Sequence, residues 1–226
     1  MDTPSTGLEA AQCIDTVSLG MVVIDEIRLP SRPPLVDKAR GSGIYATLGS
    51  RLFATRAQSK RIGCLALAGY DFPNAGRSFA TPPAPLKPSP SDLVNTVLLG
   101  SQAFHMLATP EEIEKQIPEL IKLRAQYGIT ERPFVVWKPF PASCTRQNRH
   151  AYLQACRHVD VFSPNHLEIS ALFEDTSPKG FQPDQLEAYA LEFCKGTGVS
   201  GNGIVVVRCG EYGSLTTRNA ATAKQV

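Results

Sequence analysis

The chain of 226 residues is long enough for one large domain with a substantial hydrophobic core. Hydrophobic residues make up 42% and charged residues 19%, a composition typical of a soluble globular protein. The 23 Lys and Arg residues nearly balance the 21 Asp and Glu residues and are scattered along the chain, so the charge pattern excludes a basic stripe that would bind nucleic acid.

Short apolar runs alternate with longer amphipathic runs, which is the pattern of helices placed between parallel strands. The predicted strands are Ile14–Ile24, Ile62–Gly69, Val97–Leu107, Phe134–Trp137, Val159–Ser163, Ile204–Cys209 and Ser214–Thr217. The predicted helices are Ser42–Arg56, Pro110–Tyr127, Arg146–Arg157, a segment starting at His166, and Pro183–Lys195. The sequence therefore predicts an α/β fold with a mainly parallel central sheet.

Two features mark boundaries within this alternation. Thr109 and Glu112, three residues apart, form the signature of a capping box at a helix start, and Pro110 between them is typical of the first helical position. Residues 72–92 are rich in Pro, Ser, Ala and Gly, and such a segment forms neither an ordinary helix nor a central strand. We therefore expect a long loop there, within a single domain that extends over residues 1–226.

The sequence also indicates the cellular compartment. No apolar run approaches the roughly 20 residues that span a bilayer. Met1–Ala11 lacks the basic region and apolar core of a secretory signal. The six cysteines are widely spread, without the spacing of a zinc or redox motif. We expect reduced, mostly buried thiols in a cytoplasmic protein with no membrane partner.

Two features near the predicted first strand are candidates for ligand binding. Asp25 follows that strand, which also contains Gly20, at the carboxyl edge where open α/β sheets bind ligands. Gly41-Ser42-Gly43 leads into a helix whose free N–H groups can face a hydroxyl or an anion. The simpler interpretations are a solvated acidic residue at Asp25 and a plain tight turn at Gly41–Gly43.

Asn165 and Glu168 form a second candidate, in the first turn of the helix that follows a predicted strand. They are three residues apart and so share one helix face. Beside a nucleotide, Glu168 could organise hydrated Mg²⁺. The alternative is an N-cap Asn with a first-turn Glu, which stabilises the helix end without any ligand.

The remaining motifs are weaker. Gly210 and Gly213 flank a turn after a buried strand, which taken alone indicates a hairpin. The four histidines show no metal-binding spacing and no Ser or Cys partner, so a structural role is the simpler interpretation for each; they are His105, His150, His158 and His166. Neither a P-loop nor a Rossmann fingerprint occurs.

Taken in order, these features resemble the PfkB/ribokinase family of carbohydrate kinases. Gly20, Asp25 and Gly41–Gly43, followed by Gly69-Tyr70-Asp71, match the family's sugar-binding first half. The further matches are to its Asn-x-x-Glu motif, at Asn165 and Glu168, and to its Gly-x-x-Gly turn, at Gly210 and Gly213. Several local details resemble a divergent fungal branch, that of the killer-toxin maintenance proteins; they are Gly43–Ala46, Phe104–Leu107 and Trp137–Pro139.

The resemblance implies a ribokinase-like three-layer sandwich and transfer of the ATP γ-phosphoryl group to a hydroxyl of a sugar or nucleoside. It also implies roles for individual residues. Asp25, Gly41 and Gly43 would bind the acceptor, and Gly210 and Gly213 would line the nucleotide site. Asn165 and Glu168 would bind phosphate and Mg²⁺, with Glu168 contacting the metal through water. The implied cofactors are ATP and Mg²⁺. Catalysis in such a site depends on positioning and charge stabilisation.

Three departures qualify this expectation. The family's Gly-Ala-Gly-Asp motif, which supplies the base and the anion hole, is expected after Gly213 and does not occur before Val226. Residues 72–92 stand where lid strands are expected, and Ile44–Ala46 replace an expected Asn. We therefore predict an incomplete domain with a reduced lid that is inactive as it stands, with an exposed sheet edge that favours a homodimer. The alternative is a non-catalytic regulatory or binding protein with the same fold.

Overall fold

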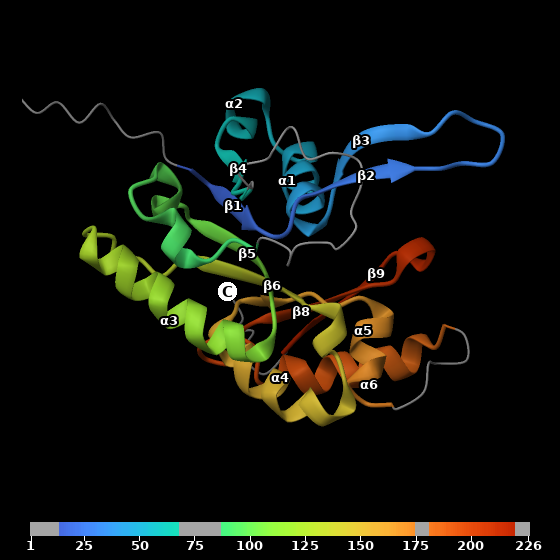
Figure 1. The fold of residues 1–226 in the computed structure, drawn as a ribbon. Helices are drawn as coiled ribbons and strands as arrows, with labels where there is room; N and C mark the ends of the chain where they lie inside the picture. The colour runs from blue at the N-terminus through green and yellow to red at the C-terminus, as the bar shows by residue number, and fades with distance from the viewer. Residues whose placement is uncertain (1–13, 68–86, 175–180, 220–226) are drawn as a thin grey trace, which may run out of the picture.

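The computed structural model describes residues 14–67, 87–174 and 181–219 (Figure 1). The strands are β1 Thr16–Leu19, β2 Val23–Ile27, β3 Leu35–Arg40, β4 Ile62–Cys64, β5 Ala103–Ala108, β6 Phe134–Pro139, β7 Val161–Phe162, β8 Ile204–Arg208 and β9 Ser214–Arg218. The α-helices are α1 Ser42–Leu52, α2 Arg56–Ser59, α3 Pro110–Gln126, α4 Arg149–Ala155, α5 His166–Ala171 and α6 Pro183–Cys194. The predicted α/β class is confirmed.

Seven strands form the central sheet, in the order β4-β1-β5-β6-β7-β8-β9. Every neighbouring pair is parallel except β8 and β9, which form an antiparallel hairpin. Because the parallel strands all point the same way, their carboxyl ends meet along one edge of the sheet, and ligands of open α/β sheets bind at that edge.

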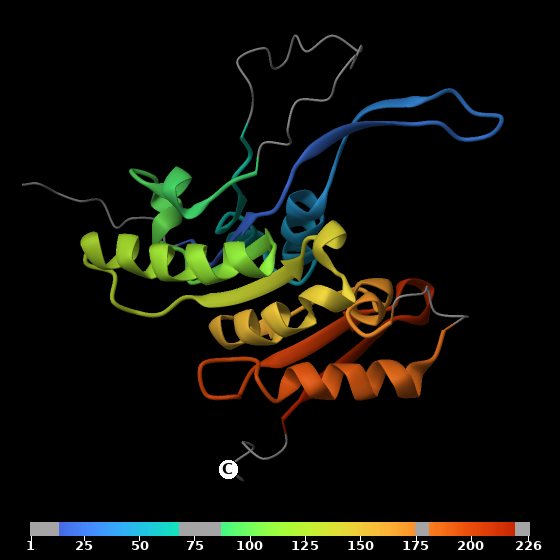
Figure 2. The same ribbon diagram turned by 60° about the horizontal axis from the view of Figure 1, so that its bottom comes forward.

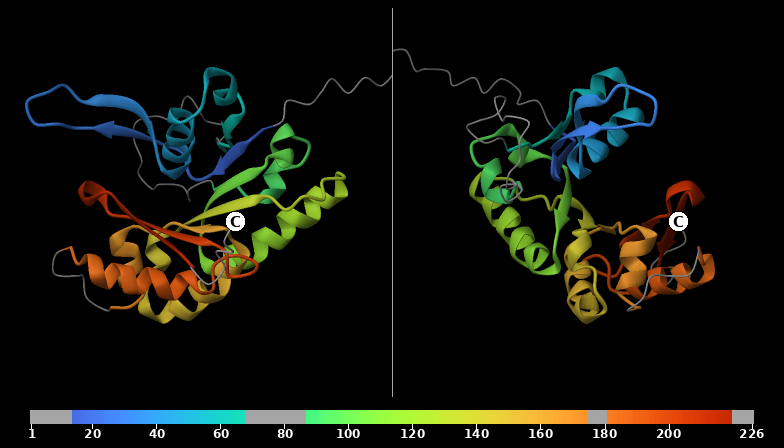
Figure 3. Two further views of the ribbon diagram at one scale, coloured as in Figure 1. Left: turned by 180° about the vertical axis from the view of Figure 1, so that it is seen from behind. Right: turned by 45° about the vertical axis from the view of Figure 1, so that its right-hand side comes forward.

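The two faces of the sheet have different covers, as Figure 3 shows: α3 to α6 lie on one face and α1 and α2 on the other. Side chains alternate between faces along a strand. On β5, Phe104 and Met106 are buried in the main core, and the intervening His105 is on the face of α1. On β6, Trp137 is buried and Lys138 is on the opposite face. One face thus holds the core, and the other carries the polar groups.

A capping box starts α3, as the sequence predicts. The side chain of Thr109 accepts a hydrogen bond from the backbone N–H of Glu112, and the Glu112 carboxylate accepts one from the N–H of Thr109 at 2.7 Å. Together they satisfy two N–H groups that a helix start otherwise leaves unpaired.

Thr109→Ala is expected to lower the free energy of unfolding by about 1 kcal/mol, because it removes the acceptor for the Glu112 N–H. Thr109→Ser keeps the hydroxyl and should cost much less. Urea unfolding followed by circular dichroism measures both. Equal losses in the two variants would show that the methyl group of Thr109, and not its cap, carries the effect.

The predicted first strand is wrong as a single element. The chain leaves the central sheet after Leu19, and Val23–Ile27 pairs instead with β3 in a separate antiparallel two-stranded sheet. This β2–β3 arm projects away from the central sheet (Figure 2). The break falls where Gly20 packs against the start of α1: a Cβ on Gly20 would lie 2.5 Å from the backbone N of Gly43. The arm itself is absent from the sequence prediction.

Other boundaries also differ from the prediction. Val97–Gly100 is a 3-10 turn, and β5 begins only at Ala103. The predicted helix Ser42–Arg56 divides into α1 and the short α2, which has its own cap at Thr55. Of the predicted loop 72–92, residues 72–86 lie outside the described residues, as does Gly69-Tyr70-Asp71. In the described part of the chain, no helix combines the length and apolarity needed to cross a bilayer.

Candidate functional site

A cavity of about 530 Å³ opens at the carboxyl ends of the parallel strands, on the face that α1 partly covers. Its walls come from the end of β1, the start of α1, and the ends of β5, β6, β7 and β8. The residues that line it are Met21, Gly41, Ser42, Tyr45, Ala46, His105, Leu107, Lys138, Phe140, Pro141, Ser163 and Arg208. This is the position where the topology predicts a ligand site.

The start of α1 forms one wall and is held by close backbone contact. Gly41 has φ of +100°, in the region that favours glycine, and a Cβ there would lie 2.4 Å from the carbonyl oxygen of Met21. Gly43 donates its N–H to that same oxygen at 2.9 Å, and a Cβ on Gly43 would lie 2.5 Å from the Gly20 oxygen. The glycine cluster is therefore more than a plain tight turn, because it brings the helix start against the end of β1.

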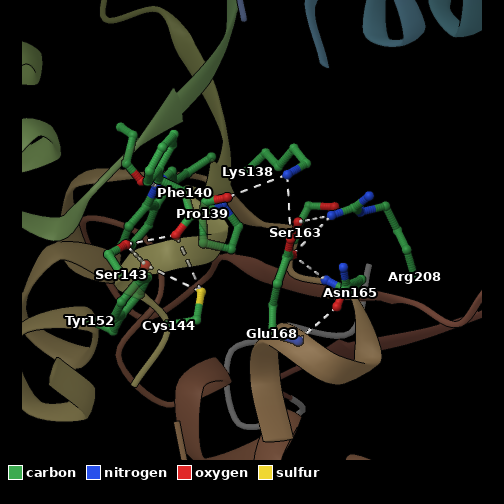
Figure 4. A network of polar contacts seen from close by, with 12 residues as sticks. Lys138, Pro139, Phe140, Ser143, Cys144, Tyr152, Ser163, Asn165, Glu168 and Arg208 are labelled. Atoms are coloured by element: carbon green, nitrogen blue, oxygen red, sulfur yellow. Dashed lines mark hydrogen bonds and ion pairs between the residues drawn. The ribbon is translucent and has the colours of Figure 1, made fainter. Parts of the chain in front are cut away.

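The opposite wall is built around Glu168 (Figure 4), whose side chain is 5% exposed. Its Oε1 lies 3.4 Å from Lys138 Nζ, and its Oε2 accepts from Arg208 Nη2 at 3.1 Å and from the backbone N–H of Asn165 at 2.7 Å. The Glu168 N–H in turn donates to Asn165 Oδ1 at 2.7 Å. Asn165 and Glu168 are thus a capping box at the start of α5, as the simpler interpretation holds.

This geometry bears on the predicted metal. Both oxygens of Glu168 already accept hydrogen bonds or ion pairs from protein groups. A metal bound directly to this carboxylate would have to displace Lys138 or Arg208, so the arrangement does not fit direct coordination of Mg²⁺ by Glu168, and the predicted contact through water stays a prediction. Among the described residues, no group of three or more His, Cys, Asp or Glu side chains is placed to hold a metal ion. The assignment of phosphate to Asn165 and Glu168 stays a prediction.

His105 is the polar residue that the sequence did not single out. Its Nδ1 lies 2.8 Å from Oγ of Ser18, which is 1% exposed and also accepts from the N–H of Gly20 at 3.2 Å. Neutral His105 has two tautomers compatible with this contact: Nδ1 accepts from the Ser18 hydroxyl while Nε2 carries the proton, or Nδ1–H donates to Ser18 Oγ and Nε2 is an acceptor. Burial and, to a smaller extent, the nearby positive charges of Lys138 and Arg208 together lower the pKa of His105 to about 4.

This lowered pKa predicts a pH-dependent stability. The unfolded chain binds a proton at His105 near pH 6.5 and the folded one only near pH 4, so stability is full above about pH 6.5 and is lost as pH falls toward 4. Between pH 7.5 and 5.5 this site should cost on the order of 1 kcal/mol. His105→Asn keeps an acceptor for Ser18 and should remove that part of the slope in urea unfolding. An unchanged slope would contradict the prediction.

The other predicted residues belong to the β2–β3 arm and to the turn of the β8–β9 hairpin. Asp25 does not end β1; it lies within β2 of the arm, in backbone register with Lys38, and its role with an acceptor stays a prediction. Gly210 and Gly213, with φ of +61° and +83°, form the turn of the β8–β9 hairpin, and neither lines the cavity. His105, Lys138 and Arg208 do line it. Their signal in the sequence is a polar side chain near the end of each predicted parallel strand.

The thiols are structural. The five cysteines in the described part of the chain are free, and four are buried. Burial raises the pKa of Cys144 to about 11, and its Sγ lies 3.4 Å from the hydroxyl of Tyr152 (Figure 4). Tyr152 shares a second hydrogen bond, of 2.6 Å, with Ser143. A thiol with a raised pKa is a poor nucleophile, and this network fixes the loop after β6 beneath the cavity.

The structure has a ribokinase-like α/β fold. The solved structure of ribokinase from Giardia lamblia superposes with a TM-score of 0.51 at 12% identity, over 94% of this chain and 74% of that one. The predicted resemblance to the ribokinase and PfkB kinases is thus confirmed at the level of the fold.

Two fungal proteins are similar in sequence, which agrees with the predicted fungal branch. An uncharacterized protein of Schizosaccharomyces pombe is 28% identical over 256 residues, covering 95% of this chain and 66% of that protein. Protein MAK32 of Saccharomyces cerevisiae is 28% identical over 117 residues, covering 50% of this chain and 31% of that protein. The chain therefore spans just under two thirds of the first relative and about a third of the second. No protein-family model matches the chain.

Proposed function

We propose that the protein is a PfkB-like carbohydrate kinase whose chain, as given, binds a sugar or nucleoside without transferring phosphate to it. The observation that carries the proposal is the cavity at the carboxyl ends of the parallel strands, closed by the Gly41–Gly43 start of α1. This is where the fold class binds small molecules, and the cavity volume suits a monosaccharide or nucleoside. The proposed phosphoryl donor is ATP, with Mg²⁺ bound to its phosphates and contacted by Glu168 only through water.

The described part of the site offers no group suited to be a general base. No carboxylate is among the described residues that line the cavity. Glu168 lies behind Lys138 and Arg208, and its oxygens accept from them. The low pKa of His105 makes it a weak base at neutral pH. Binding without turnover is therefore the expected behaviour of this chain.

Two measurements on the same preparation test the proposal. Calorimetric titration with ribose, fructose and adenosine should detect binding of at least one of them. A coupled assay of ATP consumption with the same acceptors should give no signal above the no-enzyme rate. Turnover that is lost in Glu168→Ala would overturn the claim of binding without transfer. Absence of binding to every acceptor would overturn the assignment to small-molecule binding.

A non-catalytic regulatory or binding protein is the second candidate. It is favoured by the Asn165–Glu168 capping box, which is complete without a ligand. Recovery of one defined protein partner by the purified chain, with no acceptor bound in the titrations, would favour this alternative.

The proposal includes a cytoplasmic location and a homodimer. α1 leaves apolar side chains exposed on its outer face, with Leu48, Leu52 and Phe53 at 53%, 82% and 93% exposure. Exposed apolar surface of this kind favours association. Analytical ultracentrifugation should find a dimer that Leu52→Glu weakens, and a monomer at all concentrations would contradict it.

A further inference from the structure

The polar groups around the cavity are mainly hydrogen-bond donors. Lys138 and Arg208 donate only, and His105 is a donor as well in the tautomer that accepts the Ser18 hydroxyl at Nδ1 and carries its proton on Nε2. Several backbone acceptors of the lining are already used. Five backbone carbonyl oxygens of the lining each accept a hydrogen bond from another protein group. They are the oxygens of Met21, Gly41, Phe140, Pro141 and Ser163, and their donors are, in the same order, Gly43, Tyr45, Ser143, Cys144 and Arg208. The acceptors left to a ligand there are chiefly hydroxyl oxygens.

The charge of the cavity wall is positive. Glu168 is 5% exposed, and the side chains of its partners Lys138 and Arg208 are 18% and 43% exposed. Figure 4 shows the two cations reaching the carboxylate from different strands. The carboxylate therefore lies behind the cations and is not part of the lining, whereas both cations are. One negative charge offsets two positive ones, which leaves one positive charge to face a ligand.

We propose that the ligand carries an oxyanion, a phosphate or a carboxylate, which Lys138 and Arg208 bind and toward which His105 donates its Nε2–H. This inference rests on the proposed function, because it names the class of ligand for the same cavity. Each hydroxyl of a neutral sugar has a proton to donate, and a wall of donors leaves that proton without a partner, which costs affinity. An oxyanion only accepts, and its bonds to cationic donors are the stronger kind.

The first experiment is calorimetric titration of the full chain with matched pairs of probes. Ribose is compared with ribose 5-phosphate, and fructose with fructose 6-phosphate. Each phosphorylated probe should bind at least about tenfold more tightly than its neutral partner, as expected for one charge-assisted hydrogen bond. Ribonate, inorganic phosphate and metal-free ATP are three further probes. They show whether the preferred anion is a carboxylate, a phosphate alone, or the phosphates of a nucleotide.

Variants then assign the effect to the named donors. Arg208→Gln and His105→Asn should each weaken binding of the preferred phosphorylated probe about tenfold, with little change for its neutral partner. Lys122→Gln, on the outer side of α3, removes an exposed cation far from the cavity and is the matched control. Loss of Lys138 or of Arg208 alone leaves buried Glu168 without one of its cations, so the Lys138→Gln, Glu168→Gln double variant is used for Lys138, and Arg208→Gln is repeated in the Glu168→Gln background.

The outcomes separate this inference from the function on which it rests. Neutral sugars that bind as tightly as their phosphates would overturn the oxyanion and leave small-molecule binding intact. Phosphorylated probes whose affinity does not change in Arg208→Gln, in His105→Asn or in the double variant would overturn the site. Binding of neither kind of probe would overturn both. A retained thermal unfolding transition in each variant shows that the lost affinity is not lost folding.

Discussion

Trp137→Ala is expected to lower the free energy of unfolding by about 4 kcal/mol, the largest loss for any substitution considered. Trp137 lies on β6 with no exposed surface, and its ring stacks on Tyr152 with centroids 5.1 Å apart and packs against Phe162 at 4.9 Å. Its Nε1 donates to the carbonyl oxygen of Ala108 at 2.9 Å. Truncation would leave a cavity beside the rings of Tyr152 and Phe162 and remove one of the two hydrogen bonds to the Ala108 carbonyl, which also accepts from the N–H of Phe140.

Urea unfolding at neutral pH measures this loss, and Trp137→Phe is the matched control. Phenylalanine keeps most of the ring packing and loses only the hydrogen bond to Ala108 with a small part of the volume. It should therefore cost clearly less than alanine. A loss below about 2 kcal/mol for Trp137→Ala would mean that the layer between β6 and α4 is not tightly packed.

Gly43→Ala is expected to destabilise the fold by about 2 kcal/mol and to weaken ligand binding as well. A Cβ at this position would lie 2.5 Å from the carbonyl oxygen of Gly20 and 3.0 Å from Sγ of Cys64. Because the nearest atom belongs to backbone, α1 has to move away from β1. That movement displaces Gly41 and Ser42, which line the cavity.

Gly49→Ala is the internal control, because it makes the same chemical change in the same helix. A Cβ on Gly49 meets no atom within 4 Å. Alanine is favoured over glycine in a helix by roughly 0.5–1 kcal/mol, so this variant should be neutral or more stable. Thermal unfolding and calorimetric titration compare the two. Equal stability of Gly43→Ala and Gly49→Ala would contradict the close contact between α1 and β1.

The sequence predicts those elements whose signals are local. The capping boxes at Thr109 and at Asn165 depend on residues three apart in the chain, and both are found. The break after β1 depends on contact between Gly20 and Gly43, which are far apart in sequence. For that reason the sequence pattern of Ile14–Ile24 resembles one continuous strand, although its first part belongs to the central sheet and its last part to the two-stranded sheet. The apolar run Val97–Gly100 indicated a strand but forms a 3-10 turn, in which only Leu99 is buried and Val97 is 63% exposed.

The site was predicted less completely than the fold. The Gly41–Gly43 wall was recognised because glycine clusters are conspicuous. His105, Lys138 and Arg208 come from three different strands. They line the same cavity only because of the order of these strands in the sheet and the face on which each side chain lies, and neither can be predicted from a local pattern. For Asn165 and Glu168, the sequence left open whether the pair binds a ligand or caps a helix. The capping geometry is local, but the ion pairs of Glu168 with Lys138 and Arg208 are not, and no local pattern connects those two residues to it.

The β2–β3 arm joins the rest of the protein through the wall of the cavity. The chain enters the arm just after Met21 and leaves it just before Gly41, and both residues line the cavity. The same two residues are bound to the start of α1, where the oxygen of Met21 accepts the N–H of Gly43. A ligand that contacts Met21 and Gly41 therefore touches both ends of the arm at once. We therefore expect occupancy of the cavity to change the orientation of the arm, a change that a probe attached to the arm's far end would report.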